Sequence, residues 1–218
     1  DLAALLGGTD VEALRTAAAA LREAGDDAGW LRVAERWAGL APGDARAFYH
    51  QGFAARRLGR AEAARAAFAR AAALEPGFVS ARLELAVLLL EAGEAEAAIA
   101  ELRAVVAQAP GEIQARVNLG AALRRAGRPN EARETYAQAL AQAPDHAHLR
   151  LNFANLLLEQ ERFEEALPHL QHLAELRPED SDAQVRLGDC YRKMKRPAEA
   201  YACFRRALRL QPGHPRAC

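Results

Sequence analysis

The chain has 218 residues, and its 29 basic residues (Lys and Arg) balance its 29 acidic residues (Asp and Glu), so the formal net charge at pH 7 is zero. A balanced charge gives no indication of a nucleic-acid partner, for which a basic surface is typical. The longest aliphatic stretch in a core-facing segment, residues 85–90, is much shorter than the roughly 20 residues of a membrane-spanning helix, so no membrane partner is expected either.

The three cysteines, Cys190, Cys203 and Cys218, are odd in number and lie close to the end of the sequence. This arrangement is not typical of a disulfide framework, so it predicts a reducing, cytoplasmic location. Cys190 and Cys203 are expected to act as small buried hydrophobic residues.

A proline that recurs every 34 residues organises the chain, and a constant interval of this size indicates stacked structural repeats. These prolines are Pro42, Pro76, Pro110, Pro144, Pro178 and Pro212. We number the positions of each repeat so that this proline is position 32. Residues 1–10 then form a lead-in segment, and six repeats follow at residues 11–44, 45–78, 79–112, 113–146, 147–180 and 181–214. Each repeat is predicted to hold two helices of about 14 residues, the second ending before the proline.

The first repeat, residues 11–44, has the features of an atypical terminal repeat that caps the stack. Thr9 and Glu12 have the spacing of a capping box, so the first helix is expected to begin there and to end at Gly25. Trp30 and Trp37 fall on one face of the second helix, where they are predicted to be buried.

Glycine is predicted to end the first helix of repeats 2 to 4 in a left-handed conformation, at Gly59, Gly93 and Gly127. Repeats 5 and 6 have Glu161 and Lys195 at this position, so their turns are expected to be tighter or to have a different shape.

Position 8 alternates between Gly and Ala along the chain, with a period of 68 residues. A glycine there is accompanied by an aromatic residue at position 24, whereas the alanines of repeats 3 and 5 are accompanied by leucine. Such an exchange of volume predicts that the two positions are in contact. The glycine–aromatic pairs are Gly52 with Phe68, Gly120 with Tyr136, and Gly188 with Phe204.

Together with the alanines at position 20 of repeats 2 to 6, these small and aromatic positions resemble the tetratricopeptide repeat family over residues 45–214. The tryptophan that is typical of position 4 is missing. The resemblance implies an all-α fold, a right-handed superhelical solenoid of antiparallel helix pairs, whose concave surface is formed by the first helix of each pair and binds peptides or partner proteins.

Transferring this surface to positions 2, 5, 6, 9, 12 and 13 gives the candidate binding residues. Val117 and Val185 are among those assigned to it, at position 5. The residues expected to contact a peptide are Asn118, Asn152, Asn155, Arg124, Arg125, Arg186, Tyr49, Phe53, Gln114, His148 and Arg192.

Asn118 and Asn152 share position 6 of adjacent repeats. A side-chain amide both donates and accepts, so a row of asparagines can pair with the backbone of an extended peptide of any sequence. The pair resembles a short piece of the asparagine ladder in the tetratricopeptide arm of O-GlcNAc transferases. The alternative is that asparagine is simply tolerated on an exposed helix.

Positions 12 and 13 alternate between basic pairs, such as Arg124 and Arg125, and pairs that carry one acid, such as Leu158 and Glu159. One interpretation is a partner with mixed charge or with carboxylates that the arginines bind. The other is a solvated surface whose charges neutralise one another.

Other chemistries have weaker support. Of the five residues needed for the family's chaperone-binding carboxylate clamp, only Asn152 and Arg186 match, and Asp182 has the wrong sign. No catalytic motif is present, so neither enzymatic activity, nor a cofactor, nor a metal is expected. Four histidines that could be drawn as a metal cluster lack an organising motif and are interpreted as solvated or packing residues: His146, His148, His169 and His172.

Residues 215–218 are interpreted as the start of a further helix, so we expect a piece of a longer protein, or an end covered by another chain or a second copy. Tyr201, Phe204 and Leu208 would then lack a covering helix. The predicted function is a peptide- or protein-binding module. One alternative is the substrate-recruiting arm of a larger enzyme, of glycosyl- or sulfotransferase type, whose catalytic domain follows residue 218. The other is an assembly scaffold that binds through its convex face or its edges.

Overall fold

The computed structural model describes residues 2–213 and 215, and within these residues all regular secondary structure is α-helical. The predicted all-α class is therefore confirmed. No helix in the described part of the chain has the length and apolar character needed to cross a membrane. Cys218 and most of the predicted further helix at 215–218 lie outside the described residues.

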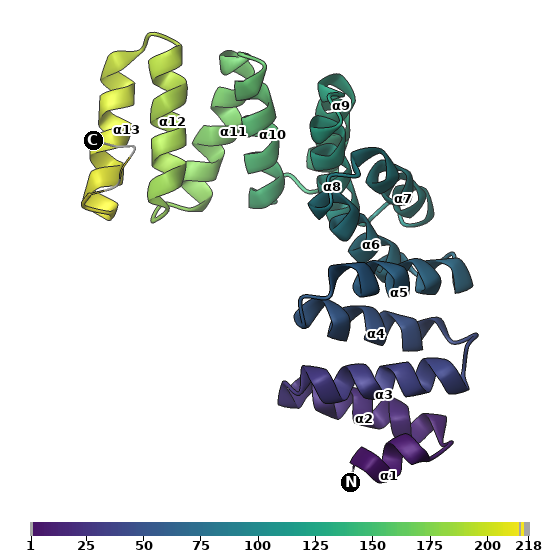
Figure 1. Ribbon diagram of the computed structural model, residues 1–218. Helices are drawn as coiled ribbons and strands as arrows, with labels where there is room; N and C mark the ends of the chain where they lie inside the picture. Colours follow the sequence, from purple (N-terminus) through teal and green to yellow (C-terminus); the bar gives the residue numbers. More distant parts are fainter. Residues whose placement is uncertain (1, 214, 216–218) are drawn as a thin grey trace. The chain divides into compact units, whose positions relative to one another are not determined.

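A short helix, α1 (Leu2–Gly7), precedes six pairs of longer helices, and we call the first member of each pair helix A and the second helix B (Figure 1). The A helices are α2 (Val11–Ala24), α4 (Ala45–Arg57), α6 (Val79–Glu91), α8 (Ile113–Arg125), α10 (Ala147–Glu159) and α12 (Ser181–Lys193). The B helices are α3 (Asp27–Leu40), α5 (Ala61–Leu74), α7 (Ala95–Gln108), α9 (Pro129–Gln142), α11 (Phe163–Leu176) and α13 (Pro197–Leu210). From α2 to α12, each helix A begins 34 residues after the one before it.

The chain divides into two compact units, residues 1–115 and residues 116–218. In the first unit each helix from α2 to α7 packs against the next one along the chain, and α1 contacts α2 and α3. In the second unit the same neighbour-to-neighbour packing connects α9 to α13. Contacts of this kind are typical of a solenoid, in which each hairpin buries its apolar surface against its neighbours.

The glycines at position 8 lie directly against aromatic rings, as predicted. A Cβ atom built on Gly120 would be 2.3 Å from a ring carbon of Tyr136, a distance that no real contact allows. The equivalent distance is 2.7 Å for both Gly52 to Phe68 and Gly188 to Phe204. The missing side chain therefore provides the space that the buried ring occupies.

The turns between helices A and B share one backbone conformation in all the later repeats. Gly127 has a φ of 71°, and Glu161 and Lys195 have φ of 58° and 57°, although these are not glycines. The amide of Arg162 donates to the carbonyl of Leu157 at 2.9 Å, the bond that closes a left-handed helix end. The prediction of a differently shaped turn in repeats 5 and 6 is thus wrong, because this hydrogen-bonded loop fixes the backbone whatever the side chain.

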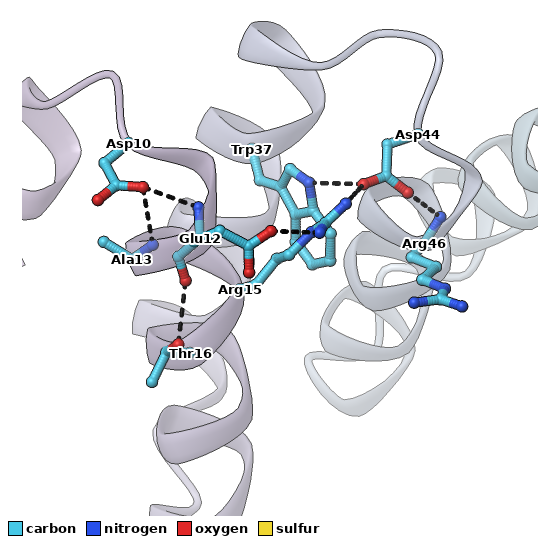
Figure 2. A network of polar contacts seen from close by, with 8 residues as sticks. All are labelled: Asp10, Glu12, Ala13, Arg15, Thr16, Trp37, Asp44 and Arg46. Atoms are coloured by element: carbon cyan, nitrogen blue, oxygen red, sulfur yellow. Dashed lines mark hydrogen bonds and ion pairs between the residues drawn. The ribbon is translucent and has the colours of Figure 1, made fainter.

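Helix α2 is capped by Asp10, so the predicted capping box at Thr9 is wrong (Figure 2). The carboxylate of Asp10 accepts from the amides of Glu12, at 2.9 Å, and Ala13, at 3.2 Å. The side chain of Glu12 instead accepts from Arg15, at 2.5 Å. A carboxylate one residue further along the chain therefore replaces the hydroxyl as the acceptor for the free amides. The helix ends at Gly25, as predicted.

Asp44 connects the first helix pair to α4 (Figure 2). Its Oδ2 accepts from Trp37 Nε1, at 3.1 Å, and from the guanidinium of Arg15, at 2.5 Å. Its Oδ1 accepts from the amide of Arg46, at 3.0 Å, and so caps α4. Burial alone would raise the pKa of this carboxyl, but the hydrogen bond from Arg15 and the other donors hold the pKa below its usual value. Both Trp37 and Trp30 are only 2% exposed, as predicted.

Candidate functional site

The helix-A surface of the second unit carries most of the predicted binding residues. Asn155 on α10 accepts, through Oδ1, a hydrogen bond of 3.0 Å from the guanidinium of Arg186 on α12. Asn152 lies one turn from His148, with 3.5 Å between Nδ2 and the ring Nε2. Asn118, on α8, is half-buried like Asn152 and Asn155. The structure therefore brings Asn155 and Arg186 together and leaves Asn152 partly accessible.

The charged side chains of positions 12 and 13 pair with one another between repeats. Arg124 forms an ion pair with Glu159 at 2.6 Å, and Arg56 forms the equivalent pair with Glu91 at 3.1 Å. Arg192 pairs with Asp189 on its own helix at 2.8 Å. These contacts agree with a surface whose charges neutralise one another.

Two residues assigned to this surface are buried in the core instead. Val117 is 1% exposed and Val185 is fully buried, so neither can contact a partner. Val185 packs with Ala207, Phe204 and Leu208 of α13. An aliphatic side chain at position 5 thus serves to join helix A to helix B, which corrects its assignment to the binding surface.

Other predicted residues remain at the surface. Gln114, Arg125 and His148 are exposed. Cys190 and Cys203 are buried, and burial raises the pKa of the Cys190 thiol to about 11, which makes it unreactive.

Of the four histidines, His172 contacts Asp145, and His169 is half-buried with its pKa lowered by burial and by Arg150. No group of three or more metal-binding side chains occurs among the residues that the structure describes.

In the first unit, Tyr49 and Phe53 belong to an aromatic cluster on the helix-A surface of α4. Their ring centroids are 4.9 Å apart, and each also contacts the buried ring of Phe68. Tyr49 also lies 4.8 Å from Phe78. Because of this burial, the pKa of the Tyr49 hydroxyl is raised.

A pocket of about 160 Å³ opens beside these rings. Tyr49 and Phe53 form part of its wall, and the other lining residues are Arg22 from α2, Trp30 from α3 and His50 from α4. We call it the Arg22 pocket. Its walls are mainly aromatic, and its charged group is a guanidinium.

His50 has a defined tautomer in this pocket. Trp30 Nε1 donates to its Nδ1 at 3.2 Å, so the neutral ring carries its proton on Nε2. Burial and the nearby Arg22 lower the pKa of His50, against the opposite effect of Asp44. The ring is therefore neutral at pH 7 and offers an Nε2–H donor.

Arg22 and Trp30 were not among the binding residues predicted from the sequence, whereas His50 falls at position 6 of the second repeat, on the predicted surface. Arg22 occupies position 12 of the first repeat, equivalent to Arg124, so extending the position rule to that repeat would have found it. Trp30 could not be found in this way, because other repeats have a small residue at its position.

A second, more open groove lies on the helix-B side of the second unit, between α11 and α13 over α12. Its volume is about 700 Å³, and Tyr191 and the buried Gln184 form part of its floor. Gln171 donates to the Tyr191 hydroxyl at 2.9 Å and so orders one wall.

Comparisons with known proteins agree with this architecture. One family model described as "Tetratricopeptide repeat" matches residues 55–123 and 157–217, and a second with the same description matches residues 111–179. No curated protein sequence matches the chain.

Among solved structures, a tetratricopeptide repeat protein from Parabacteroides merdae aligns with a TM-score of 0.80 at 18% identity, covering 96% of this chain and 83% of that one. A double mutant of MamA aligns with a TM-score of 0.73 at 24% identity, covering 78% and 97% of the two chains. YrrB, described as a TPR protein with an unusual peptide-binding site, aligns with a TM-score of 0.70 at 18% identity, covering 84% and 95%. At these identities the likeness concerns the fold.

Proposed function

Because the chain belongs to the tetratricopeptide repeat family, we propose that it binds an extended peptide or a segment of a partner protein through the surface of its A helices. The family model covers more than half of the chain, and proteins with this repeat generally serve as protein-interaction modules. We further propose that this chain is itself non-catalytic and acts by binding.

The observation that carries the proposal is the group of amides on the helix-A surface of the second unit. Arg186 holds the Oδ1 atom of Asn155, which orients the amide and leaves its NH₂ group to donate to a guest. Asn152, one turn earlier on α10, provides a second amide, and Asn118 a third on α8. Such groups can pair with peptide backbone whatever its side chains, and each net hydrogen bond contributes about 1 kcal/mol.

The arginines nearby contribute orientation more than affinity. Arg124 and Arg192 each have an acidic partner within the chain, so a guest carboxylate would have to compete with Glu159 or Asp189. This competition favours recognition of backbone groups by the asparagines over recognition of charge in this unit.

A double substitution tests the proposal. Asn118→Ala with Asn152→Ala removes two amides from the A helices, and we expect it to weaken partner capture in a pull-down by about tenfold or more. The matched control is Asn130→Ala with Gln138→Ala, which removes two exposed amides from helix B α9.

Equal capture by both double variants would contradict the proposal, and loss of capture only in the control variant would favour binding through helix B. Thermal melts of both variants establish that each still folds.

A further inference from the structure

The Arg22 pocket lies where a recurring ion pair of the chain is missing. In the second repeat, Arg56 at position 12 binds two glutamates of the following repeat. Its guanidinium lies 2.5 Å from Glu84 at position 6 and 3.1 Å from Glu91 at position 13. Two repeats later, Arg124 makes the second of these pairs, with Glu159. The chain thus places a glutamate against an arginine of position 12 at these two sites.

The first repeat has the arginine without the glutamates. Arg22 occupies position 12, but the residues equivalent to Glu84 and Glu91 are His50 and Arg57. Arg57 contacts Asp27 instead, with 2.9 Å between Nε and Oδ1. Among the residues that the structure describes, no carboxylate forms an ion pair with Arg22.

The pocket at this place has the size and the walls for one side chain. Its volume of about 160 Å³ is below the roughly 300–1,000 Å³ of small-molecule sites. The rings of Trp30 and Phe53 provide apolar walls, and His50 offers the Nε2–H that Trp30 leaves unused. That donor has no hydrogen-bond partner in the described part of the chain.

We propose that the Arg22 pocket binds a glutamate side chain of the partner's extended segment. The guest carboxylate accepts from Arg22 and from His50 Nε2–H, and its two methylene groups pack against Trp30 and Phe53. The guest thereby takes the place of the glutamates that Arg56 binds within the chain. This inference rests on the proposed function only in treating the guest as part of a peptide; the residues that line the pocket all belong to the first unit.

Glutamate fits better than the alternatives for two reasons. Arg56 and Arg124, which share position 12 with Arg22, each contact a glutamate of the chain. A carboxylate carried on two methylene groups therefore suits an arginine at this position. An apolar side chain would fill the pocket but leave Arg22 without an acid, and a charge-assisted hydrogen bond is about twice as strong as a neutral one.

Capped amino acids provide a direct test on the full chain. N-acetyl-glutamate N-methylamide is titrated while the indole N–H resonance of Trp30 is followed by NMR, with Trp37→Phe used to assign the two indoles. We expect a saturable shift of the Trp30 signal. The isosteric, uncharged N-acetyl-glutamine N-methylamide should bind about tenfold more weakly or worse.

Arg22→Gln should weaken binding of the glutamate probe by about tenfold or more, whereas Arg32→Gln, which removes an exposed charge from α3 outside the pocket, should leave it unchanged. Thermal melts verify folding of both variants. Equal binding of the glutamate and glutamine probes, or equal binding by the Arg22 and Arg32 variants, would overturn the proposal, as would no binding of the glutamate probe at all.

Tighter binding of N-acetyl-leucine than of the glutamate probe would assign the pocket to a chain-terminal carboxylate and would also overturn the proposal. These titrations contain no partner protein. A failure here, combined with loss of partner capture in the Asn118 and Asn152 double variant, would therefore remove the pocket's role and leave the proposed function standing.

Discussion

Substitution of Gly120 by alanine tests the packing on which the fold depends. In an exposed helix, Gly→Ala stabilises by about 1 kcal/mol because alanine has the higher helix propensity. At Gly120, however, the new Cβ would lie 2.3, 2.5 and 2.7 Å from three ring carbons of Tyr136. Tyr136 is only 1% exposed, so its ring has no open space to move into.

Overpacking of a buried site costs about 1–3 kcal/mol, and this contact is at the severe end. We therefore expect Gly120→Ala to lower the free energy of unfolding by about 1–2 kcal/mol after the gain in propensity. Gly39 on α3 is the matched control, because a Cβ there meets no atom within 4 Å. Gly39→Ala should be neutral or stabilising, by up to about 1 kcal/mol.

A second-site change makes the test specific. Elsewhere the chain pairs alanine at position 8 with leucine at position 24, as in Ala86 and Leu102. Adding Tyr136→Leu to Gly120→Ala copies that pair. The double variant should therefore be more stable than the sum of the two single effects on the free energy of unfolding, by about 1–3 kcal/mol.

Urea denaturation is monitored by far-UV circular dichroism. Tryptophan fluorescence would not report on this contact, because both tryptophans lie in the first unit. Gly120→Ala at or above wild-type stability, or simple additivity in the double variant, would refute the argument.

Three further changes probe the caps, turns and titrating groups. Asp44→Ala removes the α4 cap and the acceptor of Trp37 Nε1, so the free energy of unfolding should fall by about 2 kcal/mol. A thermal melt should show a lower melting temperature, and an unchanged melting temperature would contradict the stabilising role of Asp44. Glu161→Gly relieves a left-handed residue and should stabilise by up to about 1 kcal/mol, with Lys195→Gly behaving alike; destabilisation of both in urea would contradict the turn assignment. The pKa of His50 is lowered in the folded state, so the unfolded chain binds a proton at this histidine more tightly than the folded chain does. The folded state is therefore destabilised as the pH falls below the pKa that His50 has in the unfolded chain. Melting temperatures between about pH 7.5 and about pH 5.5 should therefore fall less in His50→Asn than in wild type, and equal falls would count against this linkage.

The repeat architecture was predictable because its signals repeat within one sequence. The exchange of glycine against aromatic residues, as at Gly52 and Phe68, occurs several times, so volume conservation alone indicated a contact that the structure confirms. The left-handed turn at Glu161 was not predictable from the side chain, because the hydrogen bond to the Leu157 carbonyl fixes the backbone there.

The binding surface was less predictable, because a position rule states where a residue lies and not what it contacts. Val185 has the position of a surface residue, but an aliphatic side chain there packs into the core. The Arg22 pocket could not be predicted, because Arg22 lacks, among the described residues, the acidic partners that Arg56 has. Only the observed ion pairs of Arg56 show that glutamates are missing at the two equivalent positions beside Arg22. Trp30, at a position that is otherwise small, had no equivalent from which to predict its contact with His50.

Binding of the partner to the A helices can be tested by site-specific photo-crosslinking. A benzoylphenylalanine residue is introduced in place of Asn152 on α10 or, as the control, in place of Gln138 on α9, and each protein is irradiated with its partner. If the partner binds to the A helices, we expect a covalent adduct from position 152 and none from position 138. An adduct from position 138 alone would contradict it.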